Sequence, residues 1–133
     1  MITWLNHIAI AVPDLSEATA RYELLGGKVS EPQARVEEGV TVAVVTFPNT
    51  KIELLHPLGE ASPLIDYLEE HPRGGVHHLC FEVEDIDAAS TLLRSVNCRI
   101  LGNGGPKNGA HGKPVIFVDP NDFHGALVEF EQM

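Results

Sequence analysis

An internal repeat restricts the fold of this chain more than any other feature. Residues 7–18 align without a gap with residues 78–89, so that His7 corresponds to His78 and Asp14 to Asp85. Each segment begins with an apolar run typical of a strand and continues into a pattern typical of a helix, with the aspartate at the N-cap position. The repeat predicts that the chain is built from two copies of one supersecondary unit.

Each copy has a pattern typical of β-α-β-β-β. The two helices are expected at about residues 15–25 and 87–96, and a short linking helix is expected at about 63–70. The strands that follow the helices are expected at about residues 28–35, 40–47, 51–55, 98–101, 114–118 and 126–131. The first strand after each helix has the weakest pattern of the set.

These elements predict an α+β fold in which residues 1–133 form a single domain. The domain is expected to consist of two tandem βαβββ modules, at about residues 1–58 and 75–133, joined by the short linker helix. A chain of this length can bury a sizeable core, and its 44% content of hydrophobic residues is ordinary for a globular protein.

Charge and hydropathy exclude several classes of partner. The formal net charge of −10 argues against nucleic acid, and no apolar run approaches the roughly 20 residues that span a bilayer. The segment that starts at Met1 has no basic and apolar regions typical of a secretory signal, so a cytoplasmic location is expected. The two cysteines, Cys80 and Cys98, are expected to be reduced and structural.

Strand parity brings out two repeated pairs of polar residues. Alternate side chains of a strand face opposite sides, so His7 and His78 lie on equivalent faces, opposite the apolar residues of their strands. Glu53 and Glu129 are likewise equivalent, each between apolar neighbours in the last strand of its copy. Burial of a carboxylate is costly unless it is paired or bound to a metal. A solvated strand face would also fit the two glutamates, and only the repeat favours a shared divalent ion.

The remaining polar residues near these strands are predicted to have structural roles. His77 is expected to pack or cap, and His56 is expected to lie in a loop. Glu131 is expected to be solvated, and Glu82 is expected to form a structural salt bridge.

Four segments of the chain, residues 6–14, 50–58, 74–80 and 110–117, have a distinctive combination of motifs. The most specific parts are the His77-His78 pair and the segment His111-Gly112-Lys113-Pro114. With these segments the chain resembles the methylmalonyl-CoA epimerase family of the vicinal oxygen chelate superfamily, and the resemblance covers nearly the whole chain. The resemblance implies a glyoxalase-like fold, in which the two modules form a curved, cupped mixed sheet with the helices on its outside.

The resemblance also implies a metal-dependent enzyme. One divalent ion would be held by His7, Glu53, His78 and Glu129, with Co²⁺ as the first choice and Zn²⁺, Mn²⁺, Ni²⁺ or Mg²⁺ as alternatives. The implied reaction is interconversion of (2R)- and (2S)-methylmalonyl-CoA by abstraction of the α-proton through an enolate. An acyl-CoA substrate and a homodimer are implied as partners.

Two acid–base groups on opposite faces of the substrate carbon are the simplest arrangement for this reaction. The resemblance assigns one of them to Glu129. Some relatives place the second on a glutamate whose position is occupied here by Val42. Glu53 is therefore the first substitute, followed by Glu38 and His111. Lys113 and Arg73 are candidates for contacts to the CoA phosphates.

Three other functions are compatible with the same fold. A lactoylglutathione lyase-type isomerase uses the same kinds of ligand, and an extradiol dioxygenase needs iron with two histidines and one carboxylate. Glu53 as a fourth ligand argues against the dioxygenase. A protein that only binds a small molecule commonly lacks the ligand set, which is complete in this chain.

Overall fold

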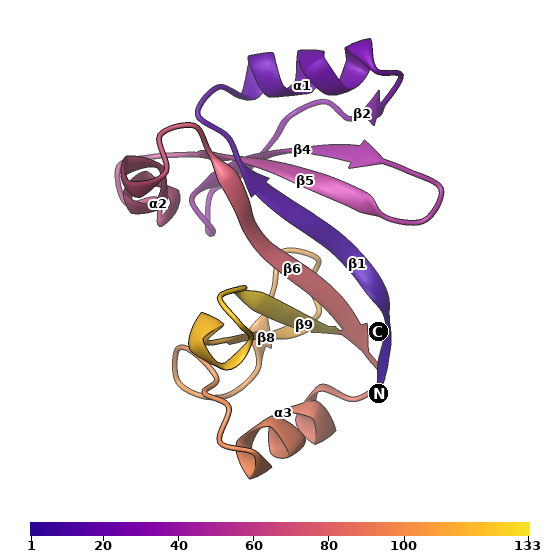
Figure 1. The fold of residues 1–133 in the computed structure, drawn as a ribbon, viewed down its shortest axis with the longest axis vertical. Coiled ribbons are helices and arrows are strands. Elements are labelled where there is room, and N and C mark those ends of the chain that lie inside the picture. Colours follow the sequence, from indigo (N-terminus) through magenta and orange to yellow (C-terminus); the bar gives the residue numbers. More distant parts are fainter. The chain divides into compact units, whose positions relative to one another are not determined.

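The structure is a computed structural model that describes residues 1–133 (Figure 1). It contains three α-helices and a mixed β-sheet, which confirms the predicted α+β class. The chain divides into two compact units, which are described separately. Unit 1 comprises Met1–Asn6 and His78–Met133, and unit 2 comprises His7–His77. The single domain with modules at about 1–58 and 75–133 stays a prediction.

Unit 2 packs helix α1 against one face of its strands. The strand order is β2-β4-β5-β1, with β3 paired to β4, and β1 runs parallel to β5 while β4 and β5 are antiparallel. The elements are β1 (Ile2–Ala11, of which unit 2 contains the part from His7), α1 (Leu15–Leu24), β2 (Lys28–Val29), β3 (Gln33–Arg35), β4 (Val40–Thr46), β5 (Lys51–Pro57) and α2 (Leu64–Glu70).

The core of unit 2 follows from the alternation of side chains in β1. Ile10 and Val12 pack with Tyr22 of α1, as the parity of the strand predicted. On the other face, Ala9 and Ala11 belong to a second apolar cluster that includes Leu64 of α2. Helix α1 begins where expected, because the Asp14 carboxylate accepts a hydrogen bond from the Glu17 N–H at 3.0 Å.

Unit 1 has the strand order β6-β9-β8-β7. Strand β6 runs parallel to β9, and the β9–β8 and β8–β7 pairs are antiparallel. Helix α3 packs against this sheet through a core that includes Ile86, Val118 and Phe130. The elements are β6 (Gly75–Val83, of which unit 1 contains the part from His78), α3 (Ile86–Ser95), β7 (Lys107–Asn108), β8 (Pro114–Val118), the 3₁₀ helix η1 (Pro120–Asp122) and β9 (Val128–Gln132).

The weakest strand predictions were wrong in detail. The strand expected at 28–35 is split into β2 and β3, because Pro32 lacks an N–H and interrupts the ladder. The strand expected at 98–101 is absent: only Ile100 forms an isolated bridge, with Val118, before the glycine-rich segment 102–105 turns the chain. The short strand between α3 and β8 is instead β7, at Lys107–Asn108.

Two polar residues also differ from their predicted roles. His56 lies within β5 rather than in a loop, and one of its ring nitrogens is 3.0 Å from the carbonyl oxygen of Val12. Glu82 forms hydrogen bonds with the side chains of Trp4 and Asn6 instead of a salt bridge. His77 packs edge-on against the ring of Tyr67, as predicted.

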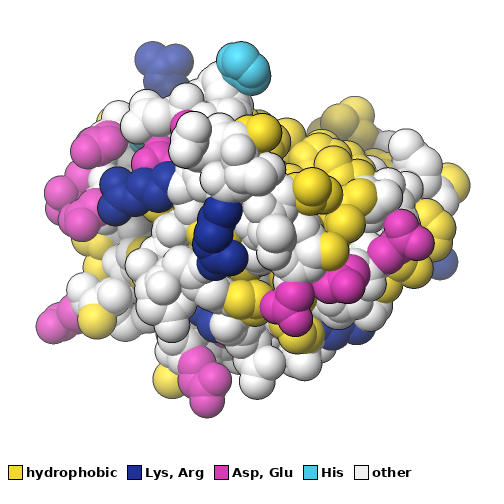
Figure 2. All heavy atoms as spheres, turned by 90° about the horizontal axis from the view of Figure 1, so that it is seen from below, with side chains coloured by type: hydrophobic (Ala, Val, Ile, Leu, Met, Phe, Trp, Pro, Cys, Tyr) yellow, Lys and Arg dark blue, Asp and Glu magenta, His cyan; other side chains and the backbone are white.

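Charged side chains of both signs occur on one face of the molecule (Figure 2). On the face shown in Figure 2, Asp and Glu side chains are spread among separate Lys and Arg side chains. None of the helices combines the length and the apolar character that crossing a membrane requires.

Candidate metal centre

Unit 1 contains a buried histidine–glutamate pair. His78 lies on β6 and Glu129 on the parallel strand β9, and the register pairs Cys80 with Glu129. His78 Nε2 is 3.3 Å from Glu129 Oε1, and both side chains are 10% exposed. The His78 ring also meets Phe117 of β8 edge to face, with the ring centroids 5.5 Å apart. These contacts hold an imidazole and a carboxylate together away from solvent.

Unit 2 contains the equivalent pair. His7 lies on β1 and Glu53 on the parallel strand β5, and the register pairs Ala9 with Glu53. His7 Nδ1 is 3.5 Å from Glu53 Oε2, and the side chains are 3% and 4% exposed. In each unit the glutamate pairs with the residue two positions after the histidine. The sequence repeat therefore corresponds to one structural arrangement that occurs twice.

Arg35 is a contact of this pair that sequence reasoning missed. It lies on the short strand β3, and its NH1 group is 3.4 Å from Glu53 Oε1. A guanidinium beside a buried carboxylate supplies a counter-charge and so reduces the cost of burial. No motif around Arg35 identifies it. It becomes recognisable only once β3 is known to pair with β4.

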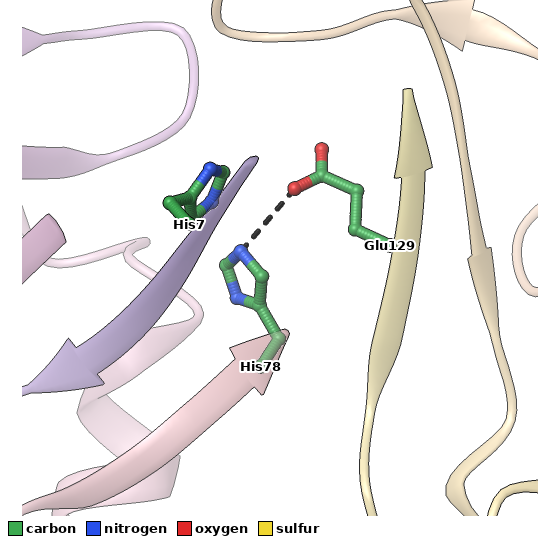
Figure 3. A group of neighbouring side chains, drawn as sticks. All are labelled: His7, His78 and Glu129. Atoms are coloured by element: carbon green, nitrogen blue, oxygen red, sulfur yellow. Dashed lines mark ion pairs between the residues drawn. The ribbon is translucent and has the colours of Figure 1, made fainter. Parts of the chain in front are cut away.

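His7, His78 and Glu129 form a group that is suited to a metal ion. Each offers one ligand atom, and these atoms lie within 4.8 Å of one another (Figure 3). Imidazole nitrogen and carboxylate oxygen are ligands for borderline divalent metals. The residues present therefore fit a divalent cation.

The other residues predicted for the site lie outside the group of His7, His78 and Glu129. Glu53 is not one of these three residues but lies beside His7, in contact with Arg35. Val42 is buried in an apolar cluster and carries no group that could transfer a proton. Glu38 is exposed in the turn before β4, and Lys113 and Arg73 are exposed in loops.

The prediction that Glu131 is solvated was wrong. Glu131 shares the face of β9 with Glu129, and only 3% of its side chain is exposed. Its two carboxylate oxygens are 2.8 and 3.2 Å from Nδ1 of His111, which lies in the loop before β8. The fully buried Cys80 thiol lies 4.0 Å from the same carboxylate. Proximity to the end of the chain suggested exposure, but the neighbouring strands cover this residue.

Comparison with known proteins identifies the family. Residues 6–117 match the family model described as the glyoxalase/bleomycin resistance protein/dioxygenase superfamily. The chain is 59% identical over the full length of both proteins to the ethylmalonyl-CoA/methylmalonyl-CoA epimerase of Cereibacter sphaeroides. The chain belongs to the methylmalonyl-CoA epimerase family. The fold predicted from the resemblance is thereby confirmed as glyoxalase-like.

Further methylmalonyl-CoA epimerases agree with this assignment. The mitochondrial methylmalonyl-CoA epimerase of Homo sapiens is 52% identical over 96% of this chain and 73% of its own. The crystal structure of the epimerase from Mycobacterium tuberculosis superposes with a TM-score of 0.86 at 29% identity, over 98% of this chain and 88% of that one. A methylmalonyl-CoA epimerase in complex with methylmalonyl-CoA and NH4+ superposes equally well, at 29% identity, over 99% and 95% of the two chains.

Proposed function

We propose that this chain interconverts (2R)- and (2S)-methylmalonyl-CoA by removing the α-proton from one face of the substrate and returning a proton to the other. The observation that carries the proposal is the buried group of His7, His78 and Glu129 in a chain of the epimerase family. The α-hydrogen of a thioester is weakly acidic, so a catalyst must stabilise the enolate and supply proton-transfer groups.

The proposed metal ligands are His7, Glu53, His78 and Glu129, of which His7, His78 and Glu129 have ligand atoms within 4.8 Å of one another. A divalent cation, Co²⁺ by preference or Zn²⁺, Mn²⁺, Ni²⁺ or Mg²⁺, acts when bound as a Lewis acid that stabilises negative charge on the enolate oxygen. Neutral imidazole is the form of histidine that binds a metal. The four buried residues would hold the ion away from bulk solvent.

Glu129 is the proposed base on one face of the substrate. Only 10% of the Glu129 side chain is exposed, and a carboxylate oxygen can accept the α-proton while the electron pair of the broken C–H bond passes into the enolate. From the sequence, Glu53 is the proposed acid–base group on the other face. Its contacts with His7 and Arg35 support the ligand role more directly.

The acyl-CoA substrate, the homodimer and the cytoplasmic location are further parts of this proposal. Lys113 and Arg73 are exposed cations, and cationic side chains bind phosphate groups, which supports them as candidate contacts. We propose that residues 1–133 act as one domain whose two modules each supply a histidine and a glutamate.

Exchange of the α-proton tests the proposal. The purified protein is incubated in heavy water with methylmalonyl-CoA of one configuration, after treatment with a chelator and again after addition of Co²⁺, Zn²⁺, Mn²⁺, Ni²⁺ or Mg²⁺. We expect deuterium at the α-carbon and formation of the opposite configuration, both dependent on metal. Absence of exchange with every metal would overturn the proposal. A glutathione hemithioacetal serves as the control substrate, and its turnover at a higher rate would favour a lactoylglutathione lyase.

A further inference from the structure

Unit 1 contains a second histidine–glutamate pair, formed by His111 and Glu131. Both oxygens of the Glu131 carboxylate face the Nδ1 atom of His111, at 2.8 and 3.2 Å. A carboxylate accepts hydrogen bonds, so Nδ1 carries the hydrogen and Nε2 is the nitrogen that can exchange a proton with a ligand. The pair thus has the composition of an imidazole oriented by an acidic residue, an arrangement used for proton transfer.

The loop that carries His111 is held in one shape by its own backbone. The Gly109 N–H donates to the carbonyl of Lys113 at 2.8 Å, and the Gly112 N–H donates to the carbonyl of Gly109 at 3.0 Å. A Cβ on Gly109 would lie 2.6 Å from a methyl carbon of Val115, so only glycine permits this close approach. Val115 in turn pairs with Glu131 across β8 and β9. The loop therefore places His111 over the strand that carries Glu131.

The burial of the pair is asymmetric. The Glu131 side chain is 3% exposed, whereas the His111 side chain is 28% exposed. Glu131 is also two residues from Glu129 on the same face of β9, which places their Cα atoms roughly 7 Å apart. A partly exposed imidazole, held by a buried carboxylate, thus lies on the face of the sheet that presents the proposed base. Such a group can exchange protons with both a bound ligand and water.

We propose that His111 is a proton-transfer residue of this site and that Glu131 is its positioning residue. The inference rests on the proposed function. In one direction, Glu129 takes the α-proton as the C–H bond breaks and its electron pair enters the enolate. The Nε2–H bond of the His111 imidazolium then breaks and leaves a neutral ring. Its proton bonds to the α-carbon on the opposite face, where the enolate supplies the electron pair of the new C–H bond. Exchange with water removes the proton from Glu129 and restores that of His111, so protons and charge balance over a turnover.

Other groups fit this role less well. Val42 has no ionisable group, and Glu38 is exposed in a turn. Glu53 is 4% exposed and is held by Arg35 and His7. The His111 ring is oriented by a carboxylate and is partly exposed to solvent. Solvent access suits a group that must recover a proton in every turnover.

The test separates exchange from inversion at the α-carbon. In H111Q the amide N–H can still donate to Glu131, but the side chain carries no transferable proton. We expect inversion to fall by about 100-fold or more from either configuration. Deuterium exchange should persist for the configuration whose α-hydrogen faces Glu129 and should be lost for the other. Metal content and KM should change little, in contrast to E53Q, for which we expect loss of metal.

Further variants keep the result interpretable. E131Q should lower kcat by about 10-fold or more while KM stays nearly constant, because the imidazole loses its orientation. Added imidazole should restore part of the inversion by H111A but not by E129Q, and H71Q serves as the matched control at an exposed histidine. Equal loss of exchange and inversion for both configurations in folded H111Q would overturn the inference, as would wild-type activity. Failure of the proposed function is distinguishable, because then the unmodified protein itself shows no exchange.

Discussion

The NH1 group of Arg35 lies 3.4 Å from Oε1 of Glu53, a carboxylate that is almost completely buried. The strand that carries Arg35 is only three residues long, yet it supplies the cation of the first histidine–glutamate pair. Because a buried charge is costly without a partner, this contact has a measurable consequence for stability.

Arg35→Ala should destabilise the protein because Glu53 would lose its counter-charge. We expect the free energy of unfolding to fall by about 2–3 kcal/mol, less than for a fully buried pair because Arg35 is partly exposed. Arg21→Ala is the matched control, since Arg21 pairs with Glu17 at 2.7 Å on the surface of α1. That variant should change the free energy by less than about 0.5 kcal/mol. Urea denaturation measures both, and equal effects would contradict the role assigned to Arg35.

His7→Ala and His78→Ala should each weaken metal binding without unfolding the protein. Loss of one of few protein ligands removes a coordinate bond that no neighbouring side chain replaces, so we expect a fall in Co²⁺ affinity of at least about 100-fold. Isothermal titration of the chelator-treated protein with Co²⁺ measures the affinity. His71→Ala, at an exposed ring that stacks on Tyr67, is the control and should bind like the wild type. Unchanged affinity in both His7 and His78 variants would argue against the metal centre.

Gly74→Ala should be more harmful than Gly26→Ala, although both glycines have a φ of +86°. A Cβ at Gly26 meets nothing within 4 Å, whereas a Cβ at Gly74 would collide with the carbonyl oxygen of Ala11 in β1. We expect a loss of about 1–2 kcal/mol for Gly26→Ala from backbone strain alone, and about 2–5 kcal/mol for Gly74→Ala. Thermal and urea denaturation measure the difference, which should vanish if only the backbone conformation matters.

Tyr67 should make stability depend on pH in the alkaline range. Burial raises the pKa of Tyr67 above its ordinary value of 10.0, so the folded protein holds the phenolic proton more tightly than the unfolded chain does. The associated stability is complete below about pH 10 and is lost as the pH rises through the pKa of the folded state. The stability advantage of the wild type over Tyr67→Phe should therefore shrink above about pH 10 in urea denaturation. A constant difference would show that the phenol titrates alike in both states.

Much of the fold follows from the repeat in the sequence. The two repeated strands, β1 and β6, are present as predicted, and the helices capped by Asp14 and Asp85 lie within a few residues of their expected bounds. These elements were predictable because capping, helical periodicity and strand parity are local properties. The absence of a strand at 98–101 was not predictable, because short strands next to glycines depend on the partners that the rest of the fold brings to them.

The candidate site was predictable to the same extent. The register of β1 with β5 and of β6 with β9 places each histidine beside its glutamate, as equivalent positions in the repeat suggested. The contacts of Arg35 and of His111 with Glu131 could not be predicted, because each joins a loop or a very short strand to a distant strand. Glu131 was misassigned for the same reason, since its burial comes from neighbouring strands rather than from its own sequence context.

The division of the chain has a consequence for the order in which the units are completed during translation. Unit 2 is one continuous stretch, so all of its residues exist once His77 has been synthesised. Unit 1 joins Met1–Asn6 to His78–Met133, and the carbonyl of Met1 accepts a hydrogen bond from the N–H of Glu84 at 3.2 Å. Residues Met1–Asn6 can therefore make their contacts within unit 1 only after more than half of the chain has been synthesised.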